Sequence, residues 1–187
     1  MYTSSAFLDG LTGGSRDAYS GGVTGLTVGW DHDVELLLDF LNTRQVLDSE
    51  ASWRAWVTER GLGRSGELAQ ARAARAALRS SIEGSSGPRT AAGVVHIELT
   101  GGIPVLSSPD AVGTVLAASA RLAVLGSWER FKICPADDCL RAFFDRSRNR
   151  SRTWCSMQVC GNREKARTFR KRTRAQNKPQ NNALATV

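Results

Sequence analysis

The chain has 187 residues, of which 41% are hydrophobic and 23% are charged, a composition typical of a folded protein with a sizeable core. The longest apolar stretch, residues 111–126, contains Arg121 and is shorter than the ~20 residues that a membrane span needs. The net charge of +7 is unevenly distributed: residues 130–187 carry 15 Lys+Arg and 4 Asp+Glu, whereas residues 1–129 carry 10 and 14. A basic C-terminal part is typical of polyanion binders, although a solubilising basic tail has the same composition.

The N-terminal residues 1–29 are rich in Gly, Ser and Thr. We expect a flexible segment that closes with a short strand at residues 26–28. The segment has no basic region followed by an apolar region, so the sequence predicts no secretory signal and a cytoplasmic protein.

The first predicted helix covers residues 33–42, where apolar residues recur at helical spacing. The second covers residues 50–60, with Ser49 as a good N-cap and Gly61 after its last residue. The apolar residues of these two helices are Val34, Leu37, Leu38, Leu41, Trp53, Trp56 and Val57.

A third helix is predicted for residues 66–82, which are rich in Ala and Arg, and Gly84 ends it. A β-hairpin follows, with strands at residues 94–99 and 103–106. A Gly-Gly pair between two β-branched runs is a favourable hairpin signal.

A fourth helix is predicted to begin with Ser108 as N-cap and Pro109 at its first position, and to continue to about Arg130. These elements predict a mainly α-helical domain with a small β-hairpin (α+β). The predicted organisation is a flexible segment at 1–29, a helical domain at 30–129, a module that contains all the cysteines at 130–174 and a disordered tail at 175–187.

All four cysteines lie in the C-terminal part, with the spacing C-x4-C, fifteen residues, C-x4-C. Two close pairs separated by a hairpin-sized insert are typical of a structural zinc site, so we expect one Zn²⁺ per chain. Disulfides are disfavoured in a cytoplasmic protein, and a catalytic thiol pair usually shows C-x-x-C. A redox-sensitive zinc site remains an open alternative. The predicted metal ligands are Cys134, Cys139, Cys155 and Cys160.

The insert between the cysteine pairs is predicted to form two strands, at residues 141–144 and 153–154, around a polar turn. Phe143, Phe144 and Trp154 are expected to cover the metal. Such a module is too small to fold alone, and zinc can supply roughly 10–16 kcal/mol of apparent binding free energy. We expect a treble-clef-like finger made of a knuckle, a hairpin and a helix.

A last helix is predicted from Arg163, with Gly161 making the turn and Asn162 as N-cap. Ala166, Phe169 and Thr173 would pack on the hairpin aromatics. Arg163, Arg167, Arg170 and Arg174 recur at helical spacing and form a row on another face of this helix. The basic side chains are expected to contact phosphates or guanine edges of DNA, although a charged row is usually only solvated. DNA is favoured over RNA because the aromatic residues are assigned to the core. The predicted DNA-binding residues are Arg146, Arg148, Arg150, Arg152, Arg163, Lys165, Arg167, Arg170, Lys171 and Arg174.

The C-terminal part resembles the CGNR zinc finger family, through the cysteine pairs together with residues 144–147, 152–157 and 160–165. More weakly, residues 37–43 and the helix of Trp56 resemble the ABATE domain that precedes this finger in bacterial proteins. The resemblance implies a bacterial transcription regulator, located at the nucleoid, whose finger binds double-stranded DNA and whose body senses a signal or dimerises.

The sequence contains no motif that indicates an enzyme. His32 and His96 are far apart, and neither has a nucleophile motif beside it. Asp39, Asn42 and Thr43 could line a ligand pocket, although such residues commonly satisfy backbone groups near helix ends.

The predicted function is therefore a zinc-dependent DNA-binding regulator, as a homodimer if one finger reads too few bases. A small molecule or a redox change would be the signal. The alternatives are a zinc-stabilised protein-interaction module and an RNA-binding protein.

Overall fold

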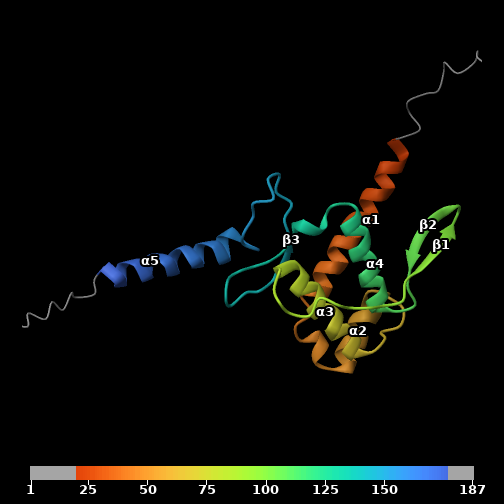
Figure 1. The fold of residues 1–187 in the computed structure, drawn as a ribbon, viewed down its shortest axis with the longest axis horizontal. Helices are drawn as coiled ribbons and strands as arrows, with labels where there is room; N and C mark the ends of the chain where they lie inside the picture. Colours follow the sequence, from red (N-terminus) through yellow and green to blue (C-terminus); the bar gives the residue numbers. More distant parts are fainter. Residues whose placement is uncertain (1–19, 177–187) are drawn as a thin grey trace, which may run out of the picture.

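The computed structural model describes residues 20–176 and is mostly helical, with two small two-stranded sheets (Figure 1). None of the helices described is long and apolar enough to cross a membrane. The helices are α1 (Ser20–Leu41), α2 (Glu50–Glu59), α3 (Leu68–Glu83), α4 (Ala111–Val124) and α5 (Asn162–Gln176). The strands are β1 (His96–Thr100), β2 (Ile103–Ser107), β3 (Phe131–Ile133) and β4 (Ala142–Phe144).

The core of the body forms where α1, α3 and α4 pack together and α2 closes one end (Figure 1). Phe40, Trp53 and Trp56 form an aromatic cluster, in which the two tryptophan rings stack with centroids 5.3 Å apart. Full burial of one large apolar side chain contributes roughly 1.5–3 kcal/mol. The helical spacing predicted for residues 33–42 is thus confirmed, with Val34 and Leu37 fully buried.

Helix α1 begins at Ser20, thirteen residues before the predicted start. The strand expected at residues 26–28 is therefore wrong, because residues 20–29 belong to this helix. The reason is that the apolar spacing of the helix continues backwards through Trp30 to residues 26 and 23 despite the glycines. The remainder of the predicted flexible segment, residues 1–19, lies outside the described residues.

The predicted N-cap of α2 and the predicted stop of α3 are confirmed, whereas α3 begins at Leu68 rather than at Gly66. The Ser49 hydroxyl accepts a hydrogen bond from the Ser52 backbone N–H at 3.1 Å, which caps α2. Gly84 ends α3 in the left-handed conformation, with φ 65°.

The predicted β1–β2 hairpin is confirmed, with Thr100 opposite Ile103. Gly101 and Gly102 form its turn with φ of 59° and 81°. Two consecutive positive φ values are characteristic of the type I′ turn that joins twisted strands.

Helix α4 is shorter than predicted at both ends. Its N-cap is Asp110, whose carboxylate accepts from the Gly113 N–H at 2.9 Å, whereas Ser108 accepts from the Asp110 N–H. The helix ends at Val124 rather than near Arg130, because Gly126 takes a φ of 66° and the Ser127 N–H bonds to the Leu122 carbonyl. A 3₁₀ turn, Trp128–Arg130, then leads into β3.

The hairpin predicted between the cysteine pairs is wrong in its pairing. Strand β4 forms as predicted, but it pairs with β3, and residues 153–154 are not in a strand. Phe131 opposes Phe144, with ring centroids 4.9 Å apart, and both side chains lie in the core of the body. This aromatic pair anchors the second sheet to the helices.

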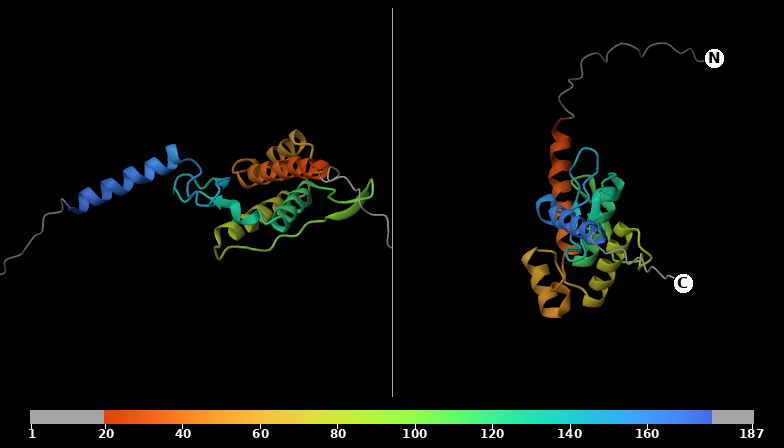
Figure 2. Two further views of the ribbon diagram at one scale, coloured as in Figure 1. Left: turned by 90° about the horizontal axis from the view of Figure 1, so that it is seen from above. Right: turned by 90° about the vertical axis from the view of Figure 1, so that its left-hand side faces the viewer.

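The last helix, α5, continues through residues 175 and 176, which the sequence assigned to a disordered tail. The rest of that segment, residues 177–187, lies outside the described residues. Helix α5 extends away from the body in Figure 1 and in the left view of Figure 2.

Candidate metal centre

The four cysteines converge at the junction of the β3–β4 connection and the start of the last helix. Cys134 and Cys139 lie in that connection, Cys155 precedes a π-helical turn (Met157–Gly161), and Cys160 lies within it. All four Sγ atoms lie within 4.8 Å of one another. The Cys139–Cys155 and Cys155–Cys160 Sγ distances are 3.5 and 3.6 Å. Four thiolates at the usual Zn–S distance have sulfurs about 3.8 Å apart, so the cluster fits a single tetrahedral zinc site.

The chemistry of the donor set also fits a metal dication. Burial, and then the hydrogen bonds among the four thiols, raise the pKa of the Cys155 thiol above its ordinary value. A bound dication reverses this preference because it stabilises the thiolate form. Four protein ligands complete the coordination shell and leave no open position, as in structural rather than catalytic zinc sites.

Two of the three aromatic residues expected to cover the metal pack on the cysteine cluster. Phe143 is buried against Cys134 and Cys160, and Trp154 packs on the same cluster. Phe144 instead faces the core of the body, because successive residues of a strand point to opposite faces.

Gly161 has a different role from the predicted tight turn. Its φ is not positive, but a Cβ atom there would lie 3.2 Å from the Trp154 ring and 2.4 Å from the Met157 sulfur. The glycine therefore permits the π-helical turn to pack closely against Trp154. The predicted N-cap Asn162 is also wrong, because Ser156 caps the π-helical turn one turn earlier.

Lys132 and Asp145 hold the loop of residues 146–152, which lies between the cysteine pairs and is called the arginine-rich loop below. The fully buried Asp145 carboxylate accepts from Lys132 Nζ at 2.7 Å and from the Ser147 and Arg152 N–H groups at 2.9 Å each. Burial alone would raise the pKa of Asp145, but these hydrogen bonds outweigh it and hold the pKa well below its ordinary value. Sequence reasoning missed this pair.

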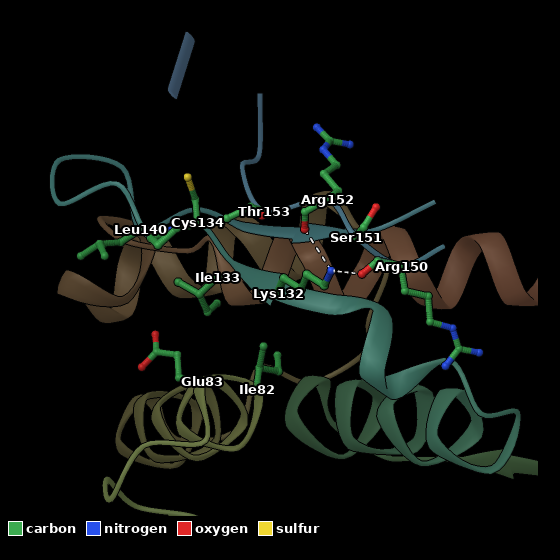
Figure 3. Close-up of a pocket in the computed structure, with 11 residues that line it drawn as sticks. Ile82, Glu83, Lys132, Ile133, Cys134, Leu140, Arg150, Ser151, Arg152 and Thr153 are labelled. Atoms are coloured by element: carbon green, nitrogen blue, oxygen red, sulfur yellow. Dashed lines mark hydrogen bonds between the residues drawn. The ribbon is translucent and has the colours of Figure 1, made fainter. Parts of the chain in front are cut away.

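A groove of about 600 Å³ lies between the end of α3 and the arginine-rich loop (Figure 3). Ile82 and Glu83 line it from α3, and Ile133 and Cys134 from the finger. Figure 3 shows the Lys132 ammonium group bonded to the carbonyls of Arg150 and Arg152. The Lys132 ammonium group is thus paired with groups of the protein itself.

The body and the metal centre are joined by hydrogen bonds to the backbone of the finger. The Asn42 side chain accepts from the Ala142 N–H at 2.9 Å and donates to the Ala142 carbonyl at 3.0 Å, as a neighbouring strand would. Arg44 donates to the Cys139 carbonyl at 2.6 Å, and Arg79 to the Leu140 carbonyl at 2.8 Å. These contacts tie the first cysteine pair and β4 to α3 and to the segment that follows α1.

Two of the three residues suggested for a ligand pocket line the same groove. Asp39 and Asn42 line a groove of about 440 Å³ between α1 and the finger, but Thr43 is buried and donates to the Phe40 carbonyl at 2.6 Å. Asp39 forms an ion pair with Arg60 at 3.0 Å. The side chains of Asn42 and Thr43 therefore satisfy backbone groups.

Five of the ten predicted DNA-binding residues form contacts within the protein. Arg146 pairs with Asp31, and Arg150 pairs with Glu129. Arg152 donates to the carbonyls of Trp154 and Cys155.

The first two arginines of the predicted helical row are also paired, with an acidic segment that sequence reasoning missed. Arg163 pairs with Asp138 at 2.8 Å and donates to the Cys160 sulfur at 3.6 Å. Arg167 pairs with Asp137 at 2.9 Å and with Glu164 at 2.8 Å. These two arginines thus attach α5 to the metal centre.

The remaining five predicted residues carry free charges, as does Arg172. Within residues 20–176 they form no ion pair or side-chain hydrogen bond, and all are exposed. They are Arg148, Lys165, Arg170, Lys171 and Arg174. Phe169 is 71% exposed, so the prediction that α5 packs on the aromatic residues through Phe169 is wrong. Helix α5 extends past the finger and buries none of its residues.

The fold and this cluster define a four-cysteine zinc finger. Residues 130–173 match the CGNR zinc finger family, so the chain carries a CGNR zinc finger domain. The match does not cover the helical body, and the ABATE domain is not separately detected. A search of curated proteins found no match to the chain.

Proposed function

We propose that the zinc finger binds double-stranded DNA, and that the chain is a DNA-binding regulator in which residues 30–129 form an ABATE-like regulatory domain. The observation that carries the proposal is the free charge of α5: its basic side chains beyond the metal centre have no acidic partner among the described residues. A row of cations held on a rigid helix is suited to the phosphates of a duplex groove.

In this proposal the paired arginines orient α5, and the unpaired basic residues contact DNA. Arg163 and Arg167 fix the first turns of α5 on the zinc centre, so the helix has a defined direction. Arg170, Lys171 and Arg174 lie farther along the helix and supply the contacts to DNA. Arg148, at the tip of the loop that Asp145 holds, supplies one more phosphate contact.

Binding to duplex DNA should weaken when charge is removed from the free part of α5. We expect Lys171→Ala/Arg174→Ala to reduce the slope of log affinity against log salt by about 2, because two phosphate contacts are lost. Fluorescence anisotropy of a labelled duplex over a salt series measures this slope.

The matched control is Arg54→Ala/Arg89→Ala, which removes the same charge from exposed positions of the body. We expect it to leave the slope nearly unchanged. Equal losses in the two variants would mean that only net charge attracts the duplex, and the proposed interface would be wrong.

RNA or single-stranded DNA is the second candidate, because exposed Phe169 suits base stacking. Phe169 and Trp154 line a groove of about 560 Å³ with Lys165 and Arg172. A Phe169→Ala variant separates the two, since stacking contributes about 1–3 kcal/mol per base to single strands. We expect this variant to retain duplex affinity.

A further inference from the structure

The β1–β2 hairpin projects from the body at the end opposite α5 (Figure 1). Ile97 and Leu99 are 76% and 74% exposed, and they share one face with their cross-strand partners Leu106 and Pro104. A two-stranded hairpin is only marginally stable in water, whereas three or more strands are stable. The hairpin therefore has the properties of an unfinished sheet.

The two edges of this hairpin differ in their capacity to pair. Thr100 and Ile103 flank the two-residue turn, so the backbone groups of the next residues, Leu99 and Pro104, point away from the partner strand. Pro104 has no N–H, which blocks the β2 edge. The β1 edge presents the N–H and C=O groups of Ile97 and Leu99.

We propose that β1 pairs in antiparallel fashion with β1 of a second copy of this chain, about a two-fold axis at Ile97. The two hairpins then form one four-stranded sheet. In this register Val95 lies opposite Leu99 of the partner subunit, and His96 lies opposite Glu98 of the partner subunit. Each dimer contains both contacts twice, because the interface is isologous.

Charge complementarity selects the second copy and this register. His96 and Glu98 are two residues apart on one face of β1, so antiparallel pairing at Ile97 places an imidazole beside a carboxylate. Pairing shifted by two residues would place Glu98 opposite Glu98 of the partner subunit, which is unfavourable. A single open edge also limits assembly to two chains, because no edge remains after pairing.

The test is sedimentation velocity of the zinc-loaded full chain without DNA, so it does not depend on the proposed DNA binding. We expect wild type to reach the mass of two 20.2-kDa chains as concentration rises. His96→Glu places two carboxylates opposite each other twice and should raise the dissociation constant roughly tenfold. The double variant His96→Glu/Glu98→Lys restores opposite charges and should restore dimerisation.

Val124→Glu is the matched control, since Val124 is 88% exposed on α4 away from the hairpin. It should leave the dissociation constant unchanged. Zinc content and far-ultraviolet circular dichroism of every variant show that the fold is retained.

Several results would overturn the proposal. They are a wild type that is monomeric at all concentrations, a dimer that is insensitive to His96→Glu, and Glu98→Lys alone tightening the dimer. Slow hydrogen exchange at the Ile97 and Leu99 amides of a monomer would also overturn it, because another segment of the same chain would then cover the edge.

Discussion

Asp145 determines the conformation of the arginine-rich loop, which otherwise has no regular secondary structure. Its carboxylate accepts hydrogen bonds from both ends of the loop, at Ser147 and Arg152, and from Lys132 of β3. A buried carboxylate with three donors organises a backbone that strands do not hold. The loop can thus carry several arginines and still present Arg148 at a fixed place.

Replacing Asp145 by Asn should destabilise the folded chain by about 1–3 kcal/mol, because Lys132 and two N–H groups lose their charged acceptor. Urea unfolding of zinc-loaded protein measures the difference in free energy of unfolding. Asp48→Asn, at an exposed position, is the control and should change little.

The effect of Asp145→Asn on stability should depend on pH. Because folding lowers the pKa of Asp145, its stabilising effect is present above its ordinary pKa of 3.8 and is lost as the pH falls below that value. The difference in free energy of unfolding between wild type and Asp145→Asn should therefore become smaller as the pH falls. A difference that stays constant down to acid pH would show that the charge of this carboxylate does not stabilise the fold.

At the scale of elements, the two ends of α5 differ in how their basic side chains are paired. Its first turns carry the arginines paired with Asp137 and Asp138, and its later turns carry free cations. Neighbouring arginines of one row should therefore behave differently on substitution.

Arg167→Ala should weaken zinc retention in a chelator competition and leave the salt slope of DNA binding nearly unchanged. Arg170→Ala should do the reverse and reduce the slope by about 1, because one free phosphate contact is lost. Both variants are measured in both assays, so that zinc retention and DNA binding are compared separately. Equal effects of both substitutions on DNA binding would contradict the division of α5 into two parts.

The elements that the sequence predicts well are those defined by local signals. Ser49, Gly84 and the Gly101–Gly102 turn place the ends of α2 and α3 and the hairpin, because caps and turns depend on a few adjacent residues. The cysteine spacing predicts the metal cluster for a similar reason.

The elements that the sequence predicts poorly depend on distant partners. Strand β4 pairs with β3 because Phe131 and Phe144 share the core with helices far away in sequence. The ion pairs of Arg163 and Arg167 depend on Asp137 and Asp138, which helical periodicity cannot reveal. Counting arginines on one face therefore does not distinguish those paired within the protein from those whose charge is free.

At the scale of the whole molecule, the zinc finger and the helical body are not independent. The β3–β4 sheet contributes Phe131, Ala142 and Phe144 to the core of the body, and Asn42, directly after α1, hydrogen-bonds to the backbone of β4. The proposed domain boundary near residue 130 therefore does not separate two hydrophobic cores. Changes at the metal centre should therefore reach the body.

Native mass spectrometry with zinc quantification, on wild type and on Cys155→Ser/Cys160→Ser, tests the central claim most directly. The account predicts one zinc per wild-type chain and none in the variant. It also predicts a lower free energy of unfolding for the variant's body, because the sheet that shares its core is no longer held by the metal. A reduced, fully folded wild type that binds no zinc would contradict the account.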